Sequence, residues 1–400
     1  MFALVALNWN RPGDPRIPLG HASLVAALAE AEVPHRGFVV DLNGPEPCVV
    51  RLAREILDAN PGIIGIGCYV WNEAFTQKLV PQLRAQGFHG IIVLGGPQIT
   101  YAGPGVEDLY PDVDVFVRGY AEDALVEIAR GHRPVGAHFR GESDLARQAT
   151  VDLVNLPSPW TSGALPIDSG LVRMETQRGC IFKCSFCQHP GHSSSRPLSK
   201  ARVDAETELF GLGGVRKIAV LDPIFNHGPH QLRVLERLDS MRWRGDLSLQ
   251  CRFELLSDEF IELAQPLRPQ LEFGLQTIHE AEGRAVMRPN DMDRVSDAVA
   301  RLHAASLYFE VTLIYGLPNQ TLESFRETLA WCEEHRVPTV RAFPLVLLRG
   351  TQLHRDAGHW GLVEDDSTIP QVVASNSFSR DDHAEMARLA ASLVLARRAG

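Results

Sequence analysis

Apolar residues in the first part of the chain come in short continuous runs, and most runs are followed by a stretch with helical spacing. The runs predict strands at 2–8, 37–42, 62–67, 90–95 and 114–118. The intervening stretches predict helices at 22–31, 49–59, 73–85 and 122–130. Strands that alternate with such helices need crossover connections, which indicates a parallel sheet covered on both faces. We therefore expect an open doubly wound sheet with its ligand at the carboxyl ends of the strands.

The second part repeats the alternation of strands and helices. Its predicted strands are 171–177, 217–221, 247–253, 271–276, 309–315 and 339–345. Helical spacing separates them at 203–211, 232–241, 294–305 and 322–335, and an amphipathic helix is predicted at 381–398. A closed barrel of this type has eight strand–helix units, so six units predict a partial (β/α)6 barrel that does not close.

A polar, proline-containing stretch without a sustained period lies between the two patterns and predicts a linker. The expected organisation is a Rossmann-like domain at 1–135, a linker at 136–170, a partial barrel at 171–355 and a helical tail at 356–400. The fold class is α/β.

Composition and charge exclude several kinds of partner. The 400 residues include 39 Lys and Arg against 49 Asp and Glu, which gives a net charge of -10. No basic tract is present, so we expect no nucleic-acid partner, because such binding needs clustered cations. The longest apolar run, 63–71, is far shorter than the ~20 residues of a membrane span. The first residues lack the basic segment of a signal peptide, and we expect a cytoplasmic protein.

Three of the seven cysteines lie within eight residues, directly after the first predicted strand of the second part. They are Cys180, Cys184 and Cys187, with the spacing C-x3-C-x2-C. In a reducing compartment such bunching indicates metal or redox chemistry. Three thiolates can hold three irons of a four-iron cluster and leave the fourth iron open to chemistry. The alternatives are a purely structural cluster, and a zinc site completed by His189 or His192.

This loop, with the strand before it, resembles the radical S-adenosylmethionine (SAM) superfamily. The resemblance implies a [4Fe-4S] cluster whose open iron binds the amino and carboxylate groups of SAM. Electron transfer from an external donor of flavodoxin or ferredoxin type would then generate a 5'-deoxyadenosyl radical. It also implies that Phe186 packs near the adenine of SAM, and that the core is a six-unit open barrel.

Further candidates for SAM binding lie at the ends of the predicted strands. Alternation on the third strand puts Arg252 and Glu254 on one face, where they could hold the ribose and carboxylate of SAM or pair with each other. Asp222, after the second strand, could take the place of the acidic residue that contacts the SAM amino group in many superfamily members, or cap the next turn. Cys251 is expected to be a small core residue.

The ends of the fourth and fifth strands look like those of the oxygen-independent coproporphyrinogen oxidase subgroup. The residues concerned are Gln276, Arg288 and the segment Ile314-Tyr315-Gly316-Leu317-Pro318. The similarity implies that Gln276 and Arg288 belong to the SAM site and that Gly316 lets the adenine approach the backbone. Tyr315 could donate a proton or hydrogen atom near the radical, or be a core aromatic at the barrel rim.

Glycine-rich loops follow the predicted strands of the first part, where glycine would let a bulky ligand approach the backbone. A dinucleotide-binding Gly-x-Gly-x-x-Gly is absent after the first strand. The loops resemble the cobalamin-binding domain that precedes many radical SAM barrels, including those of bacteriochlorophyll cyclase type. The match rests on Gly95, Gly96, Thr100, Gly119 and Glu122. It implies a cobalamin site made by Leu19, Gly20, Tyr69, Trp71, Asn72, Gly95, Gly96, Pro97, Thr100, Gly119 and Glu122. The alternative is a domain that binds nothing, or serves only as a lid over the substrate.

Together the resemblances imply a cobalamin-dependent radical SAM enzyme that methylates an unactivated carbon of a small molecule or peptide. One alternative is a radical SAM enzyme that cyclises, rearranges or oxidises its substrate, with or without functional cobalamin. The other is a non-catalytic corrinoid- or metal-binding protein. The amino-terminal cysteine set and the tail domain of methylthiotransferases are missing, which argues against that activity.

Overall fold

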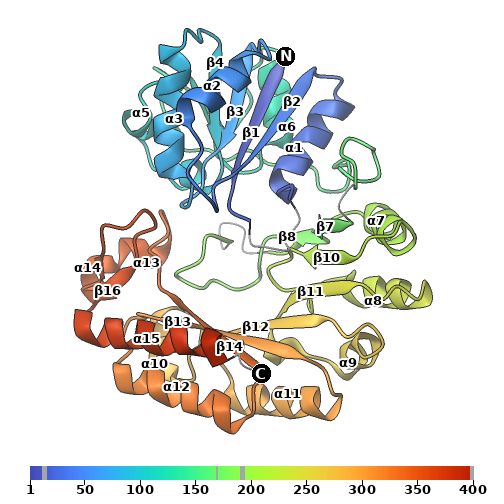
Figure 1. Cartoon of the computed structure of the whole chain (residues 1–400), viewed down its shortest axis with the longest axis vertical. Helices are drawn as coiled ribbons and strands as arrows, with labels where there is room; N and C mark the ends of the chain where they lie inside the picture. The colour runs from blue at the N-terminus through green and yellow to red at the C-terminus, as the bar shows by residue number, and fades with distance from the viewer. Residues whose placement is uncertain (11–15, 168–169, 190–193, 397–400) are drawn as a thin grey trace. The chain divides into compact units, whose positions relative to one another are not determined.

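The computed structural model describes residues 1–10, 16–167, 170–189 and 194–396. It divides the chain into two compact units, Met1–Arg173 and Met174–Gly400, each with its own sheet (Figure 1). The expected α/β class with parallel sheets is confirmed. Within the described residues, no helix has the length and apolar character that crossing a membrane requires.

The first unit contains a six-stranded sheet in the order β2-β1-β3-β4-β5-β6. Its strands are β1 (Phe2–Asn8), β2 (His35–Asp41), β3 (Ile63–Gly67), β4 (Ile91–Gly95), β5 (Val115–Val117) and β6 (Ala137–Phe139). The first five are parallel, and β6 adds an antiparallel edge. In this doubly wound order the connections reverse direction between β1 and β3, which is where such sheets bind ligands.

Helices cover both faces of this sheet, as expected from its continuous apolar strands. They are α1 (Leu19–Glu30), α2 (Val49–Leu57), α3 (Glu73–Ala85), α4 (Pro97–Thr100), α5 (Val106–Leu109) and α6 (Glu122–Ala129). Phe2 and Leu4 of β1 pack into the core beneath α1 and α6, whereas Ala3 and Val5 pack into the core beneath α2 and α3. This alternation explains why β1 reads as an unbroken apolar run.

The segment 136–170, predicted as a linker, is instead part of the first unit. It supplies β6, and Ala149 forms a β-bridge with Gly119. Val151, Leu153 and Leu156 then form a small core of their own, against which Tyr120 packs. Prolines and polar residues separate these short apolar groups, so the sequence shows neither helical nor strand periodicity here.

The second unit is built on a six-stranded sheet in the order β14-β13-β12-β11-β10-β7. The strands are β7 (Leu171–Met174), β10 (Lys217–Val220), β11 (Asp246–Cys251), β12 (Gln270–Gln276), β13 (Phe309–Tyr315) and β14 (Thr339–Pro344). Neighbours from β10 to β14 pair in parallel. All six predicted strands are present, and the order matches an open barrel.

An outer layer of helices follows these strands (Figure 1). It comprises α7 (Lys200–Leu212), α8 (Gln231–Ser240), α9 (Asp258–Ala264), α10 (Glu280–Ala285), α11 (Met292–Ala304) and α12 (Leu322–Glu334). Side chains of Ser199, Ser257, Asp291 and Thr321 cap α7, α9, α11 and α12 by accepting a backbone N–H from the first turn. The starts of these four helices are therefore fixed by local sequence.

The predicted tail at 356–400 is likewise part of the second unit. After α13 (Gln352–Arg355) it contains α14 (Ala357–Trp360), the hairpin of β15 (Val363–Glu364) and β16 (Val372–Ala374), and α15 (Arg380–Ala396). The last helix packs against β13, β14 and α12, so it completes the helical layer rather than projecting from it.

Candidate functional site

The three-cysteine loop begins just after β8 (Gln177–Arg178), which pairs with β9 (Arg196–Pro197) in a short antiparallel ribbon. It therefore lies beyond the carboxyl end of β7, where barrel enzymes place their chemistry. All three cysteines are free thiols, and Cys184 is buried.

Each sulfur of this loop accepts one N–H group. The backbone N–H of Phe182 donates to Cys180 Sγ at 3.5 Å, and that of His189 donates to Cys187 Sγ at 3.4 Å. The third donor is a side chain, Nη1 of Arg288, which lies 3.6 Å from Cys184 Sγ. All three sulfurs are thus prepared to carry negative charge.

Burial of the thiols opposes their ionisation. It raises the pKa of Cys180, and it raises the pKa of Cys187 to about 11. These thiols stay protonated until a metal cation displaces the proton. No group of three or more His, Cys, Asp or Glu in the described ranges is arranged around a single ion. A four-iron cluster does not need such an arrangement, because each thiolate binds a different iron. His192, the alternative zinc ligand, lies outside the described residues.

The loop is held by segments that are distant in the sequence. Ser185 N donates to Val286 O at 2.9 Å, and Leu353 N donates to Ser185 O at 2.8 Å. The side chain of Gln188 donates to Arg349 O at 3.0 Å. The loop geometry therefore depends on residues after β12 and after β14.

Arg252 and Glu254 form an ion pair, with 2.9 Å between Nε and Oε2. The sequence-based reason for their proximity was wrong, because β11 ends at Cys251 and Phe253–Leu255 is a 3-10 turn. The Arg252 guanidinium carbon lies 4.0 Å from the centroid of the Phe182 ring, within the cysteine loop. Cys251 is a core residue, as expected.

Two residues next to this pair escaped the sequence analysis. Asn226 fixes Arg252, since it accepts the Arg252 N–H and donates to the Arg252 carbonyl, both at 2.8 Å. Phe182 supplies the aromatic face beneath the guanidinium. Two features of the sequence could have pointed to them. Asn226 ends the polar segment that begins at Asp222, and Phe182 lies between Cys180 and Cys184.

A β-bulge positions Gln276 at the end of β12. The pairing register with β13 shifts between Gly274 and Gln276, and Gln276 has a φ of 68°. Such a backbone is uncommon for residues other than glycine and often marks functional sites. A Cβ on Gly274 would lie 2.7 Å from Gln276 Nε2 and 3.2 Å from Arg288 Nη2, so glycine makes room for both side chains.

Four side chains around the cysteine loop each have a buried polar atom without a hydrogen-bond partner among the described residues. These atoms are Ser185 Oγ, Arg252 Nη1, Gln276 Oε1 and Arg288 Nε. Buried polar atoms are normally paired, so orphaned atoms grouped at a barrel end indicate a missing ligand. Donors and an acceptor of this kind fit the carboxylate and ribose of SAM. Phe186 lies in the same loop and remains a prediction for the adenine contact.

Asp222 is fully buried, and its carboxylate is engaged within the fold. Oδ1 accepts the N–H groups of Thr176 at 2.7 Å and Gln177 at 3.3 Å, and Oδ2 accepts the Thr176 hydroxyl. Asp222 therefore anchors the strand that leads into the cysteine loop. This partnering leaves it without exposure to a ligand, and it does not favour the expected contact with the SAM amino group.

Burial, opposed by these hydrogen bonds, raises the pKa of Asp222 to about 7. In the unfolded chain an Asp titrates near ~4, so between these two pH values the folded state holds a proton that the unfolded state has lost. Stability contributed by this group therefore falls as the pH rises from about 4 to 7, by about 4 kcal/mol at most. Asp222→Asn should flatten the pH dependence of urea unfolding between pH 4.5 and 7.5. An unchanged slope would contradict the assignment.

Tyr315 lies on the outer face of the barrel wall, contrary to the expected role beside the radical. Its ring centroid is 5.9 Å from that of Phe325 in α12 and 5.3 Å from that of His383 in α15. It is 6% exposed, and burial raises its pKa. Tyr315 is thus the core aromatic of the alternative interpretation.

Gly316, expected to approach the adenine, is also buried. Its N–H donates to Gln320 Oε1 at 2.7 Å, and a Cβ there would lie 3.3 Å from Val372 O. The turn requires a φ of 89° at this position, which glycine adopts readily, and this requirement explains why the residue is glycine. The close neighbour is the chain's own backbone, so the geometry does not favour an adenine contact.

In the first unit, the residues expected to bind cobalamin gather at the carboxyl ends of β3, β4 and β5. Several of them form hydrogen bonds within the first unit. Asn72 is buried, and its amide nitrogen donates to Leu7 O at 2.8 Å and Gly67 O at 3.0 Å. Thr100 Oγ1 accepts the N–H of Gly119 at 3.0 Å, and Glu122 Oε1 accepts the hydroxyl of Ser23 at 2.9 Å.

Gly96 and Gly119 make room for the protein's own backbone, which corrects the sequence-based reason for these two glycines. A Cβ on Gly96 would lie 2.6 Å from Cys68 O, and one on Gly119 would lie 2.4 Å from Ala149 O. Both glycines have positive φ, of 91° and 79°. Leu19 is buried at the start of α1, and Gly95 and Pro97 are half-buried.

An aromatic pair occupies the edge between β1 and β3. Tyr69 and Trp71 stack with their ring centroids 4.4 Å apart, and burial raises the pKa of Tyr69. A Cβ on the exposed Gly20 would lie 3.6 Å from the Tyr69 hydroxyl. Trp71 Nε1 is buried and has no partner among the described residues. A stacked pair with a free donor at this edge fits a large flat ligand.

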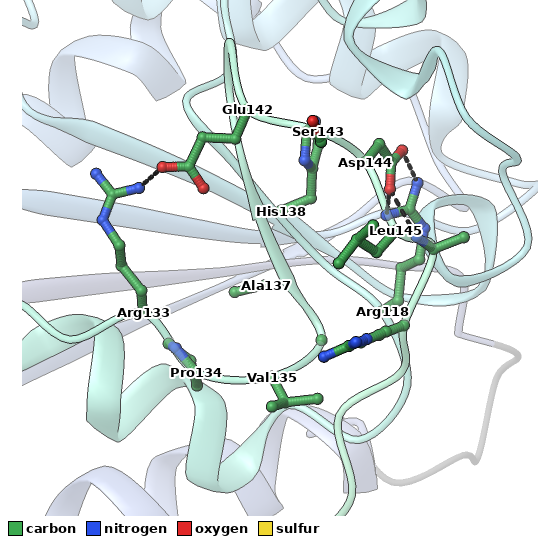
Figure 2. Close-up of a pocket in the computed structure, with 13 residues that line it drawn as sticks. Arg118, Arg133, Pro134, Val135, Ala137, His138, Glu142, Ser143, Asp144 and Leu145 are labelled. Atoms are coloured by element: carbon green, nitrogen blue, oxygen red, sulfur yellow. Dashed lines mark hydrogen bonds and ion pairs between the residues drawn. The ribbon is translucent and has the colours of Figure 1, made fainter.

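A separate cavity of about 220 Å³ in the first unit is lined by Arg118 and residues 133–138 and 142–147. Figure 2 shows two ion pairs in its lining: Arg118 binds both oxygens of Asp144, at 2.8 and 2.7 Å, and Arg133 binds Glu142. Arg118 is 1% exposed, so this ion pair is internal. With these charges neutralised within the fold, we do not assign a ligand to this cavity.

Asp144→Asn should destabilise the first unit by about 3 kcal/mol, because it leaves the buried Arg118 charge without its counterion. Glu142→Gln is the matched control, since it breaks an exposed Arg–carboxylate pair in the same segment. That change should cost less than about 1 kcal/mol. Urea unfolding of both variants measures the difference, and equal losses would contradict the structural role of the buried pair.

Comparisons with known proteins agree with this geometry. A family model described as B12 binding domain matches residues 12–129, and one described as Radical SAM superfamily matches residues 174–332. The structure of TsrM, a radical SAM methyltransferase from Kitasatospora setae with cobalamin and a [4Fe-4S] cluster bound, covers 92% of this chain and 81% of its own. Its TM-score is 0.73 at 17% identity, so the likeness is one of fold.

The matches to curated relatives cover a smaller share of each relative's own length. The cobalamin-dependent radical SAM methyltransferase TokK of Streptomyces tokunonensis is 23% identical over 70% of this chain and 46% of its own. The 2-(S-pantetheinyl)-carbapenam-3-carboxylate methyltransferase of Streptantibioticus cattleyicolor is 22% identical over 84% and 56%. The methylthiotransferase RimO of Pelobacter propionicus is 23% identical over 77% and 67%. The chain thus spans about half the length of the first two relatives.

The two family models imply a [4Fe-4S] cluster with SAM in the second unit and a cobalamin in the first. The three thiols and the orphaned polar atoms beside them fit the cluster and SAM. The Tyr69–Trp71 pair at the edge between β1 and β3 fits the corrin.

Proposed function

Because the chain carries a B12-binding domain followed by a radical SAM domain, we propose that it is a cobalamin-dependent radical SAM methyltransferase. Its acceptor is an unactivated carbon of a small molecule or peptide. The observation that carries the proposal is the loop of three free cysteines, each with an N–H donor at its sulfur, beyond a parallel strand.

The residues of the second unit would have two roles, binding the cluster and binding SAM. Cys180, Cys184 and Cys187 would hold three irons, and the fourth iron would stay open for SAM. A cluster held there would supply the electron that cleaves SAM to a 5'-deoxyadenosyl radical. Arg252 and Gln276 supply a free donor and a free acceptor beside the loop, which orient the polar groups of SAM.

The residues of the first unit would hold the methyl carrier. Tyr69 and Trp71 offer a stacked aromatic surface, and the indole N–H is free to donate to an amide side chain of the corrin. Cobalamin held there would supply the methyl group, and the methyl group of a second SAM would replace it. An external donor of flavodoxin or ferredoxin type would provide the electrons.

The test must distinguish methyl transfer from the methylthio transfer for which one relative is named. Protein purified anaerobically with cobalamin supplied is analysed for iron, for corrinoid and for 5'-deoxyadenosine formed from SAM under a low-potential reductant. Products made with SAM carrying a trideuterated methyl group are then weighed. Four irons, one corrinoid and a mass gain of one labelled methyl per product support the proposal.

Other outcomes of this experiment contradict specific parts. Cluster and SAM cleavage without corrinoid would remove the cobalamin role. A product without a methyl gain would favour cyclisation, rearrangement or oxidation. A gain that includes sulfur would favour the methylthio transfer for which RimO is named.

A further inference from the structure

The donors to the three cysteine sulfurs are not equivalent. Those at Cys180 and Cys187 are backbone amides two residues further along the same loop. The donor at Cys184 is a guanidinium, from Arg288, which lies 104 residues away in the sequence. It carries a full positive charge, and a charged donor interacts about twice as strongly with a thiolate as a neutral one does.

The structure fixes Arg288 in this position. Its Nη2 donates to the carbonyl of Gly274, and its backbone N–H donates to Gly283 O at 2.7 Å. The absent side chain at Gly274 leaves the space that Nη2 occupies. Few degrees of freedom remain for the guanidinium, so its contact with Cys184 is prepared by the fold.

The Glu254 carboxylate senses the charge of Arg288 but forms its ion pair with Arg252. No carboxylate within the described residues lies at ion-pair distance from it, whereas the neighbouring Arg252 is paired with Glu254 at 2.9 Å. Arg288 therefore places a cation without an ion-pair partner of its own beside Cys184. A positive charge and a hydrogen bond at a cluster thiolate both stabilise the reduced cluster, which carries one more negative charge.

We propose that Arg288 is a positioning residue that sets the reduction potential of the iron–sulfur cluster through Cys184. The inference rests on the proposed function, because it requires a cluster at this loop. The step concerned is a one-electron reduction by a low-potential donor. No covalent bond is made or broken in that step, and the guanidinium keeps its protons. This role is separate from a contact between Arg288 and SAM, since it operates before SAM binds.

The test measures the cluster without SAM. The full chain and the variants Arg288→Lys, Arg288→Gln and Arg288→Met are reconstituted anaerobically. Iron is quantified, and the reduced cluster is followed by electron paramagnetic resonance during a redox titration. At a fixed solution potential, Arg288→Met should lower the ratio of reduced to oxidised cluster at least tenfold, a shift of about 59 mV. Arg288→Lys keeps the charge and should shift least, with Arg288→Gln between them.

The matched control is Arg284→Met, which removes an exposed arginine paired with Glu280 in α10. It should leave the potential unchanged. A wild-type potential in Arg288→Met with four irons bound would overturn the inference. Loss of the cluster in all three Arg288 variants, but not in Arg284→Met, would also overturn it, in favour of a structural role. If only Arg288→Met fails to bind a cluster, the potentials of the other two variants test the inference. A larger shift in Arg288→Gln than in Arg288→Lys supports it, and the reverse order contradicts it. A wild-type chain that binds no cluster would instead contradict the proposed function.

Discussion

Cys184→Ala is expected to abolish cleavage of SAM, with 5'-deoxyadenosine formation falling by about 10³-fold or more, to the background rate. The substitution removes a buried thiol that accepts the Arg288 donor, and with it one of the three predicted iron ligands of the loop. Iron bound after anaerobic reconstitution should fall below four per chain. Iron analysis and chromatographic detection of 5'-deoxyadenosine measure both effects.

Two other cysteines provide the controls for this experiment. Cys48 is exposed before α2, and Cys332 is buried in α12 away from the loop. Cys48→Ala and Cys332→Ala should keep iron content and SAM cleavage, although Cys332→Ala loses some packing. Retained SAM cleavage in Cys184→Ala, or its loss in Cys48→Ala, would contradict the assignment of the cluster to this loop.

Gly96→Ala should destabilise the first unit by about 3 kcal/mol and reduce the corrinoid that it retains. Gly96 has a φ of 91° and a ψ of 178°, a conformation that is essentially restricted to glycine. An added Cβ would meet Cys68 O at 2.6 Å, so β3 and β4 could not keep their spacing at this edge. Urea unfolding and corrinoid absorbance after gel filtration measure the two effects.

Gly103→Ala is the matched control, because a Cβ at Gly103 has no neighbour within 4 Å. It should leave both stability and corrinoid content close to those of the wild type. Full corrinoid binding by Gly96→Ala would show that this edge of the sheet is not the cobalamin site.

The strands were predictable because their physical cause is local. Residues of β1 face a core on each side of the sheet, and this two-sided burial is visible as an unbroken apolar run. The antiparallel strand β6 escaped because its three residues carry no period. The order of strands in the sheet also follows from pairing between distant segments, which no local pattern encodes.

The site was predictable where its members are consecutive in the sequence, as in the cysteine loop. It was not predictable where contacts join remote segments, as between Arg288 and Cys184. Tyr315 shows a further limit. Successive side chains on a strand point to opposite faces of the sheet, but the sequence pattern does not show which of the two groups of side chains faces the helices. The contact of Tyr315 with Phe325 decides that question.

The braces of the cysteine loop have a consequence for the order of biosynthesis. Gln188 and Arg349 are 161 residues apart, and Leu353 holds Ser185 from still further along the chain. When the cysteines leave the ribosome, the residues that fix their geometry have not yet been translated. Insertion of iron and sulfide into the finished loop must therefore wait until most of the chain has been made. Until then, the thiols lack the contacts with later segments that hold the loop in the finished protein.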